Sequence, residues 1–334
     1  MNRFVFLCVL FSVLIACNSN NFDVDTSKID LSLSINRLDK ELLNSNVDSL
    51  VVLNPKLHQK YGEFYKYYIE NILGIGLVKD PALGYALHPF VSDSYVQEMY
   101  SDCQQKIPDI SFYELELTEA FRRYKFYFPE KRIPEIVVFF SAAQYKVAVT
   151  DNYLGIGLDM YLGSDYKNYQ KIGLPAYFVN TLSTDYLPAD AMKGWLFTEF
   201  DFERENADLI STFIHHGKLM YILDALLPNT EDSIKFAYSG SALRWCKDNE
   251  FNLWAHFIDN QLLYSKDQKQ ISKYLAEGPF TSGLPKESPA QVGIWVGREI
   301  VRAFMENNPK TTLSELVLLD CQQLFKNSTY KPSR

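Results

Sequence analysis

The sequence has no surplus of basic residues and, beyond its N-terminal segment, no long apolar run. Its 33 Lys and Arg residues stand against 41 Asp and Glu residues, which gives a formal net charge of −8. An acidic chain without a basic stripe is a poor binder of nucleic acid. A membrane-spanning helix needs about 20 consecutive apolar residues, and no stretch after residue 16 provides them. The composition therefore argues against nucleic-acid binding and against an integral membrane protein.

Cysteine is scarce, and none of the five cysteines stands in a C-x-x-C pair. Neither a thioredoxin-type redox site nor a cysteine-based zinc site is therefore indicated. Outside the N-terminal segment the cysteines are Cys103, Cys246 and Cys321. Three is an odd number for a chain in an oxidising compartment. They allow either one disulfide with one free thiol or three buried thiols.

The N-terminal segment has the layout of a bacterial lipoprotein signal. Arg3 supplies a positive charge, and residues 4–16 are uncharged but too short to span a bilayer. The sequence Leu-Ile-Ala-Cys at positions 14–17 matches a lipobox, in which a small residue admits the scissile bond to a tight peptidase site. We therefore expect residues 1–16 to be a signal peptide and Cys17 to carry the lipid.

Residues 17–30 are predicted to form a lipidated, polar tether, because four Asn and Ser residues follow the cysteine directly. Two or more acyl chains, such as palmitate, anchor a protein stably to a membrane. No Asp follows Cys17 directly to give an inner-membrane retention signal, and Asp23 and Asp25 do not make a dense acidic export tag. We expect a membrane-anchored lipoprotein of the cell envelope that faces the periplasm.

Residues 31–334 are predicted to form a single domain, because no linker-like composition divides them. Apolar and aromatic residues recur at helical spacing up to Pro129 and again after Pro175. Between these helical parts, three segments have the composition of strands: residues 136–140, 146–150 and 154–162. The sequence predicts an α+β fold, mostly helical, with a small and mainly antiparallel sheet.

Several residue types that often carry chemistry have a plainer interpretation here. Asp159 and Asp165 could bind a cation or act on a sugar, but acids that bound a loop are more often solvated or capping. Gly155 and Gly157 begin like a dinucleotide fingerprint but lack its third glycine, and inside a strand they indicate a bulge or a close backbone contact. The sequence contains no G-x-S-x-G elbow and no P-loop.

Other polar and aromatic residues lie in predicted helices. Arg298 and Glu299 are expected on an exposed helix surface. Three tryptophans in apolar helical contexts are expected in the core: Trp245, Trp254 and Trp295.

Four segments resemble a known family. They are Tyr153–Gly163, His216–Tyr221, Ser288–Gly297 and the closing Ser328–Pro332. Together, in this order and spacing, they resemble the gliding-motility lipoprotein family GldB of Bacteroidetes, over nearly the whole chain. The resemblance implies a role in the envelope machinery for gliding and for a dedicated secretion system, with envelope proteins of that apparatus as partners and the lipid anchor in the membrane.

The family also looks distantly similar to zincin-type metallopeptidases, which need two histidines one helical turn apart in H-E-x-x-H. This sequence has no H-E-x-x-H, and the nearest segment, Thr198–Phe202, matches only through Glu199. His216 stands where such a peptidase would place its third ligand. Two residues do not make a tetrahedral zinc site, so we interpret Glu199 and His216 as remnants of a degenerate zincin-like core and expect no catalytic residue, metal or cofactor.

The adjacent histidines His215 and His216 diverge by about 100° on a helix and cannot share one metal. We expect one of them to face the core and the other to face solvent.

Three functions remain open. The first is a non-catalytic envelope lipoprotein that acts through protein contacts in gliding and secretion. The second is a metallopeptidase-like hydrolase with a non-standard site. The third is a module that binds envelope glycans or exported polymers through its aromatic residues, which make up 15% of the chain.

The lipid anchor is directly testable. Cys17→Ala removes the thiol that accepts the lipid, so the cell should accumulate an unprocessed precursor. Labelling with a fatty-acid probe should be lost in the variant and retained in the wild type. Equal labelling of the two proteins would contradict the lipoprotein assignment.

Overall fold

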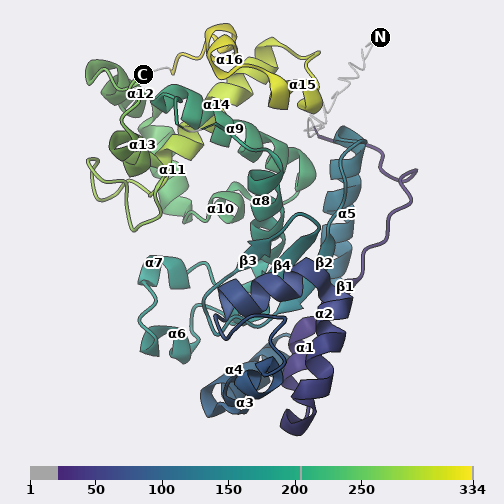
Figure 1. The fold of residues 1–334 in the computed structure, drawn as a ribbon. Helices are drawn as coiled ribbons and strands as arrows, with labels where there is room; N and C mark the ends of the chain where they lie inside the picture. The colour runs from purple at the N-terminus through teal and green to yellow at the C-terminus, as the bar shows by residue number, and fades with distance from the viewer. Residues whose placement is uncertain (1–21, 204, 333–334) are drawn as a thin grey trace, which may run out of the picture.

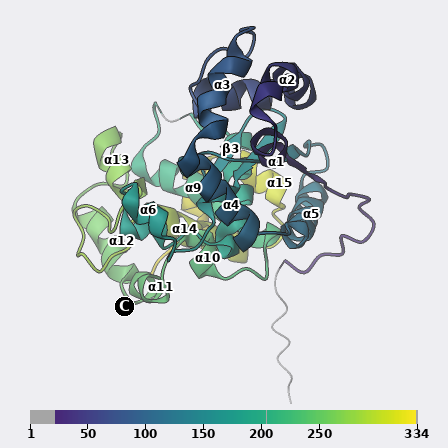
Figure 2. The same ribbon diagram turned by 90° about the horizontal axis from the view of Figure 1, so that it is seen from below.

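The computed structural model describes residues 22–203 and 205–332, so the expected signal peptide and Cys17 lie outside the described residues. Figure 1 shows a small sheet in the middle of a mostly helical body, as the α+β prediction expected. Helices α1–α4 lie below the sheet and helices α9–α16 above it. Seen from below, α5 lies on one side of the molecule and α6, α11, α12 and α13 on the other (Figure 2).

Four strands form the sheet in the order β1-β2-β4-β3. Their bounds are β1 (Ile35–Arg37), β2 (Glu135–Phe139), β3 (Val147–Val149) and β4 (Tyr153–Gly157). β2 pairs in parallel with β1 and with β4, and only β3 and β4 are antiparallel. The expectation of a mainly antiparallel sheet is therefore wrong. β3 and β4 form an antiparallel hairpin, but β4 also pairs in parallel with β2, and the unpredicted β1 adds a second parallel neighbour to β2.

The helices before β2 are α1 (Leu38–Leu43), α2 (Leu50–Tyr67), α3 (Leu83–Ser92), α4 (Ser94–Lys106) and α5 (Ser111–Tyr127). Those after β4 are α6 (Lys167–Lys171), α7 (Ala176–Val179), α8 (Leu187–Glu199), α9 (Leu209–Leu226), α10 (Asp232–Phe236), α11 (Gly240–Asp248), α12 (Glu250–Asp259), α13 (Gln268–Leu275), α14 (Val292–Asn307), α15 (Leu313–Leu318) and α16 (Cys321–Ser328). Short 3₁₀ or π turns cover Val47–Ser49, Tyr68–Ile72, Leu158–Met160 and Thr184–Tyr186.

β4 is buried along its whole length, and its two glycines, which lie two residues apart and so on one face of the strand, allow close packing there. A Cβ atom at Gly157 would lie 1.9 Å from the carbonyl oxygen of Tyr145, and one at Gly155 would lie 2.5 Å from the ring of Phe64. The predicted close backbone contact is confirmed. The strand is shorter than residues 154–162, because the chain turns into a 3₁₀ helix at Leu158.

Helix α9 is the central helix of the upper part, and α14 crosses it at very short range. A Cβ atom at Gly217 of α9 would lie 2.1 Å from the carbonyl carbon of Gly297, and one at Gly297 would lie 1.8 Å from the carbonyl oxygen of Phe213. Gly293, one turn before Gly297, accommodates the ring of Phe213 in the same way. Two of the family-like segments therefore meet backbone to backbone at this crossing.

Arg298 follows the crossing and is fully buried, with 0% of its surface exposed, so the expectation of an exposed side chain is wrong. Its guanidinium lies 2.9 Å from Asp232, 2.9 Å from Glu299 and 3.4 Å from Asp224. Lys235 adds an ion pair of 2.9 Å to Asp224. A buried charge persists only when it is paired, and these partners arrive from α9, α10 and α14.

The tryptophans are close to their expected places. Trp295 is buried, while Trp245 and Trp254 are partly buried against the core. Trp254 contacts the ring of Tyr330 at 5.1 Å, and the Tyr330 hydroxyl donates to Glu250 at 2.7 Å. The closing segment thus fastens the C-terminal end of the described chain to α12.

The first described residues run along the outer side of α5 before they enter β1 (Figure 1). Arg123 of α5 donates to the carbonyl oxygen of Phe22 at 2.8 Å, and Thr26 donates to Glu119 at 2.9 Å. No helix of the described part of the chain is long and apolar enough to cross a membrane.

From the helix crossing we predict that two Gly→Ala variants differ sharply in unfolding free energy. Gly217→Ala places a Cβ against the backbone of α14, and overpacking of this kind costs about 1–3 kcal/mol or more of unfolding free energy. Gly240→Ala, at the start of α11, meets nothing closer than the Arg244 side chain at 3.7 Å and should be neutral or stabilising. Urea unfolding of both variants measures the difference. Equal stability of the two would contradict the tight crossing.

Candidate functional site

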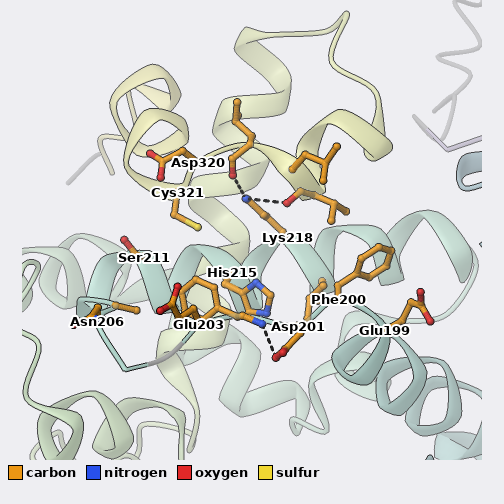
Figure 3. Close-up of a pocket in the computed structure, with 16 residues that line it drawn as sticks. Glu199, Phe200, Asp201, Glu203, Asn206, Ser211, His215, Lys218, Asp320 and Cys321 are labelled. Carbon is orange, nitrogen blue, oxygen red and sulfur yellow. Dashed lines mark hydrogen bonds between the residues drawn. The ribbon is translucent and has the colours of Figure 1, made fainter. Parts of the chain in front are cut away.

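A pocket of about 550 Å³ lies where the sequence places the degenerate peptidase site. Its walls are the end of α8, the segment that leads to α9, one side of α9 and the turn from α15 to α16 (Figure 3). Both acidic and apolar side chains line it, and Glu199, His215, Lys218 and Cys321 are among them. His216 does not line it, so the structure brings Glu199 together with the neighbouring histidine instead.

Glu199 is the last residue of α8, and its carboxylate is already engaged. Lys131 donates to it at 2.7 Å, and the same ammonium lies 5.1 Å from the ring centre of Phe200. After Glu199 the backbone leaves the helical conformation, with φ −111° and ψ 84° at Phe200. Residues 198 and 202 are therefore not one helical turn apart, as two zinc ligands of a zincin would be.

The two histidines contact different neighbours, as their divergence on α9 requires. The His215 ring stacks on Phe202 with centroids 4.4 Å apart, and the His216 ring lies 5.1 Å from that of Phe197. Both side chains are half-buried, so the expectation of one core-facing and one solvent-facing histidine is wrong. The reason is that α8 and the segment after it cover both.

Lys218 is the residue of this pocket that sequence reasoning missed. It is buried, and its ammonium donates to the carbonyl oxygens of Val317, at 3.5 Å, and Leu319. Burial lowers the pKa of Lys218, and the nearby Cys321 and Asp320 oppose this shift. Burial raises the pKa of the Cys321 thiol. Lys218 thus fastens the α15–α16 turn to α9. The only sequence signal for this residue was its place within the His216–Tyr221 segment.

The residues of this pocket do not fit the zinc ion that the zincin resemblance implies. Thr198 and Phe202 offer no imidazole, and Glu199 is bound to Lys131. Within residues 22–203 and 205–332, no group of three His, Cys, Asp or Glu side chains is placed to hold a metal ion.

The acids at the end of β4 have separate roles. Asp159 is fully buried, and its carboxylate accepts from the Ser141 backbone at 2.9 Å, the Ser141 hydroxyl at 3.0 Å and the Ala143 backbone at 2.5 Å. Ala142 and Ala143 have positive φ, and in this turn the backbone N–H groups of Ser141 and Ala143 converge on the carboxylate as an anion nest. Asp159 is therefore not solvated as expected. Asp165 is solvated as expected, because 87% of its side chain is exposed.

Lys146, which the sequence did not single out, fixes the start of the β3 hairpin. Its ammonium lies 3.1 Å from Asp190 of α8, donates to the Thr181 carbonyl at 3.0 Å and lies over the ring of Phe178 at 5.2 Å. Burial lowers the pKa of Lys146, although Asp190 opposes the shift. Lys146 therefore holds the segment that contains α6 and α7 against the sheet.

The three cysteines of the described chain are buried and unpaired with one another, which matches the alternative of three buried thiols. Burial raises the pKa of Cys246 to about 12, so its thiol stays protonated. Burial raises the pKa of Cys103 as well.

Asp159 predicts a specific pH dependence of stability. Burial raises its pKa from 3.8 to about 6, against the hydrogen bonds from Ala143 and Ser141 that lower it. The folded protein therefore holds this proton more tightly than the unfolded chain. The resulting stability is complete below about pH 4 and is lost as the pH rises through 6.

Asp159→Asn removes the titration. The unfolding free energy of the variant relative to the wild type should rise by about 1–3 kcal/mol between pH 4 and pH 7, as measured by urea unfolding. The exposed Asp165→Asn is the matched control and should show no such change. Parallel pH profiles for wild type and Asp159→Asn would refute the assignment.

Comparison with known proteins adds one match. The sequence model of a family described as gliding motility protein GldB matches residues 19–332, which include all four segments named above. No curated protein and no solved structure matches the chain, so the likeness to zincins stays a prediction. The match covers nearly the whole sequence, and the chain therefore belongs to the GldB family of gliding motility proteins.

Proposed function

We propose that this protein is a lipoprotein anchored through Cys17 that serves gliding motility by contacts with other envelope proteins, without catalysis. Membership of the family supplies the motility role. The family membership also favours proteins of the motility and secretion machinery as partners and a membrane-anchored place in the envelope. The residues after Cys17 favour a domain that faces the periplasm.

The observation that carries the proposal is that the family-like segments make packing contacts inside the protein. Gly217 and Gly297 bring two helices into backbone contact, Gly157 does the same for β4, and Tyr330 fastens the closing segment. Catalytic motifs instead present polar side chains to a cavity where substrate can reach them. Because the family-like segments serve packing, they support a protein that acts through its shape rather than through catalysis.

The engagement of Glu199 disfavours the hydrolase alternative. Glu199 would have to activate water, but Lys131 holds its carboxylate at 2.7 Å. An aromatic sugar-binding platform in this pocket is also disfavoured, because Phe202 has one ring face against His215 and Phe200 is buried. Neither observation disfavours protein contacts elsewhere on the surface.

A complementation experiment distinguishes the non-catalytic proposal from the catalytic alternative. In a gliding host, deletion of the gene should abolish colony spreading, and the double variant Glu199→Ala, His216→Ala should restore it. Loss of the ion pair between Glu199 and Lys131, whose side chain is 40% exposed, should cost about 1 kcal/mol or less. Immunoblotting checks the abundance of the double variant, and Cys17→Ala serves as the control that should not restore spreading.

A folded and abundant double variant that fails to restore spreading would revive the catalytic alternative. One equivalent of zinc in the purified wild-type protein, measured by elemental analysis, would do the same.

A further inference from the structure

A second and larger groove, of about 760 Å³, lies beside the start of the described chain. Its floor and walls come from the N-terminal segment, the end of α5, α9, the end of α14 and the segment that enters α15. Most of the side chains that line it are apolar or aromatic, with Phe22, Phe126, Tyr221, Met305 and Leu313 among them. The volume is typical of a site for a small organic ligand.

Two of the hydroxyl groups that line this groove are used within the protein. The Thr312 hydroxyl caps α15 together with Glu315, and the Ser314 hydroxyl donates to the carbonyl oxygen of Tyr127 at 2.6 Å. Glu306 is the one charged residue among the described residues that line the groove. A peptide or glycan needs hydrogen-bond partners when it is buried, whereas a hydrocarbon chain needs none.

The N-terminal segment is fixed at the edge of the groove. The ring of Phe22 packs on Tyr221 with centroids 5.3 Å apart, and its carbonyl oxygen accepts from Arg123 at 2.8 Å. Cys17 lies five residues before Phe22 in the sequence. Five residues span at most about 18 Å, so a lipid on Cys17 stays within reach of the groove.

We propose that the groove between α5, α9 and α14 binds an acyl chain of the lipid on Cys17 of the same molecule. The proposal rests on the lipid anchor proposed above. The groove supplies an apolar surface next to the attachment point, and an acyl chain that enters it leaves water without leaving its own protein. A flat bilayer does not fill a concave groove, so an attached hydrocarbon chain fits it better than the membrane surface does.

Helix α5 offers a matched pair of probe positions. Phe126 lines the groove and is 46% exposed, while Phe112, near the other end of the same helix, is 62% exposed and does not line it. Each is replaced in the full-length protein, expressed in its own host, by the photoreactive analogue p-benzoylphenylalanine, which inserts into C–H bonds under ultraviolet light. Mass spectrometry of the digest then identifies the peptide or lipid joined to each probe.

The expected result is a cross-link from position 126 to an acyl carbon of the N-terminal peptide, within a monomer, and none from position 112. A cross-link from position 126 only to the amino-acid residues of that peptide would overturn the proposal, because Phe22 lines the groove with or without the lipid. Met305→Lys places a cation in the groove wall and should reduce the cross-link about tenfold or more, since that corresponds to only about 1.4 kcal/mol of lost affinity. A position-126 cross-link to free phospholipid, to another protein or within a dimer would overturn the proposal, as would equal cross-linking at both positions.

The intact mass of the purified protein separates the two ways in which the idea can fail. A mass without acyl groups would refute the lipid anchor itself and this occupant with it. An acylated mass without the cross-link at position 126 would refute only the groove assignment.

Discussion

The contact between Gly217 and Gly297 is the constraint on which the upper part of the molecule depends. It sets the distance between α9 and α14, and that distance fixes where Arg298 can meet Asp224 and Asp232. A larger side chain at the crossing would separate the helices and leave a buried guanidinium without its partners, which is far costlier than the lost packing alone. The charge network around Arg298 therefore depends on the glycines at the helix crossing.

The strands and most helices could be predicted because their signals are local. The apolar run Ile136–Phe140 and the strand-like segments at residues 146–150 and 154–162 are visible in the sequence alone. The order of the strands could not be predicted in the same way. β1 has only three residues, Ile35–Arg37, and it exists because β2, some 100 residues later, presents a parallel edge to it. Pairing at such separation leaves no periodic trace in a short strand.

The candidate site shows the same division between local and distant causes. The missing histidines were evident from the sequence, and so was the divergence of His215 and His216 on one helix. The ion pair of Glu199 with Lys131 and the burial of Arg298 were not, since both depend on partners far along the chain. A charged residue is read as exposed unless its partner is known, and the sequence does not name the partner.

The path of the N-terminal segment along α5 determines how the domain responds to mechanical load. A pull at Phe22 meets the contacts with α5 one after another, first the hydrogen bond from Arg123 to Phe22 and then the one from Thr26 to Glu119. Release of the chain as far as Ile35 lets residues 22–34 extend to a length of about 45 Å without disturbing the sheet. The domain thus carries on its own surface a length of chain that a pull on the N-terminal segment can release.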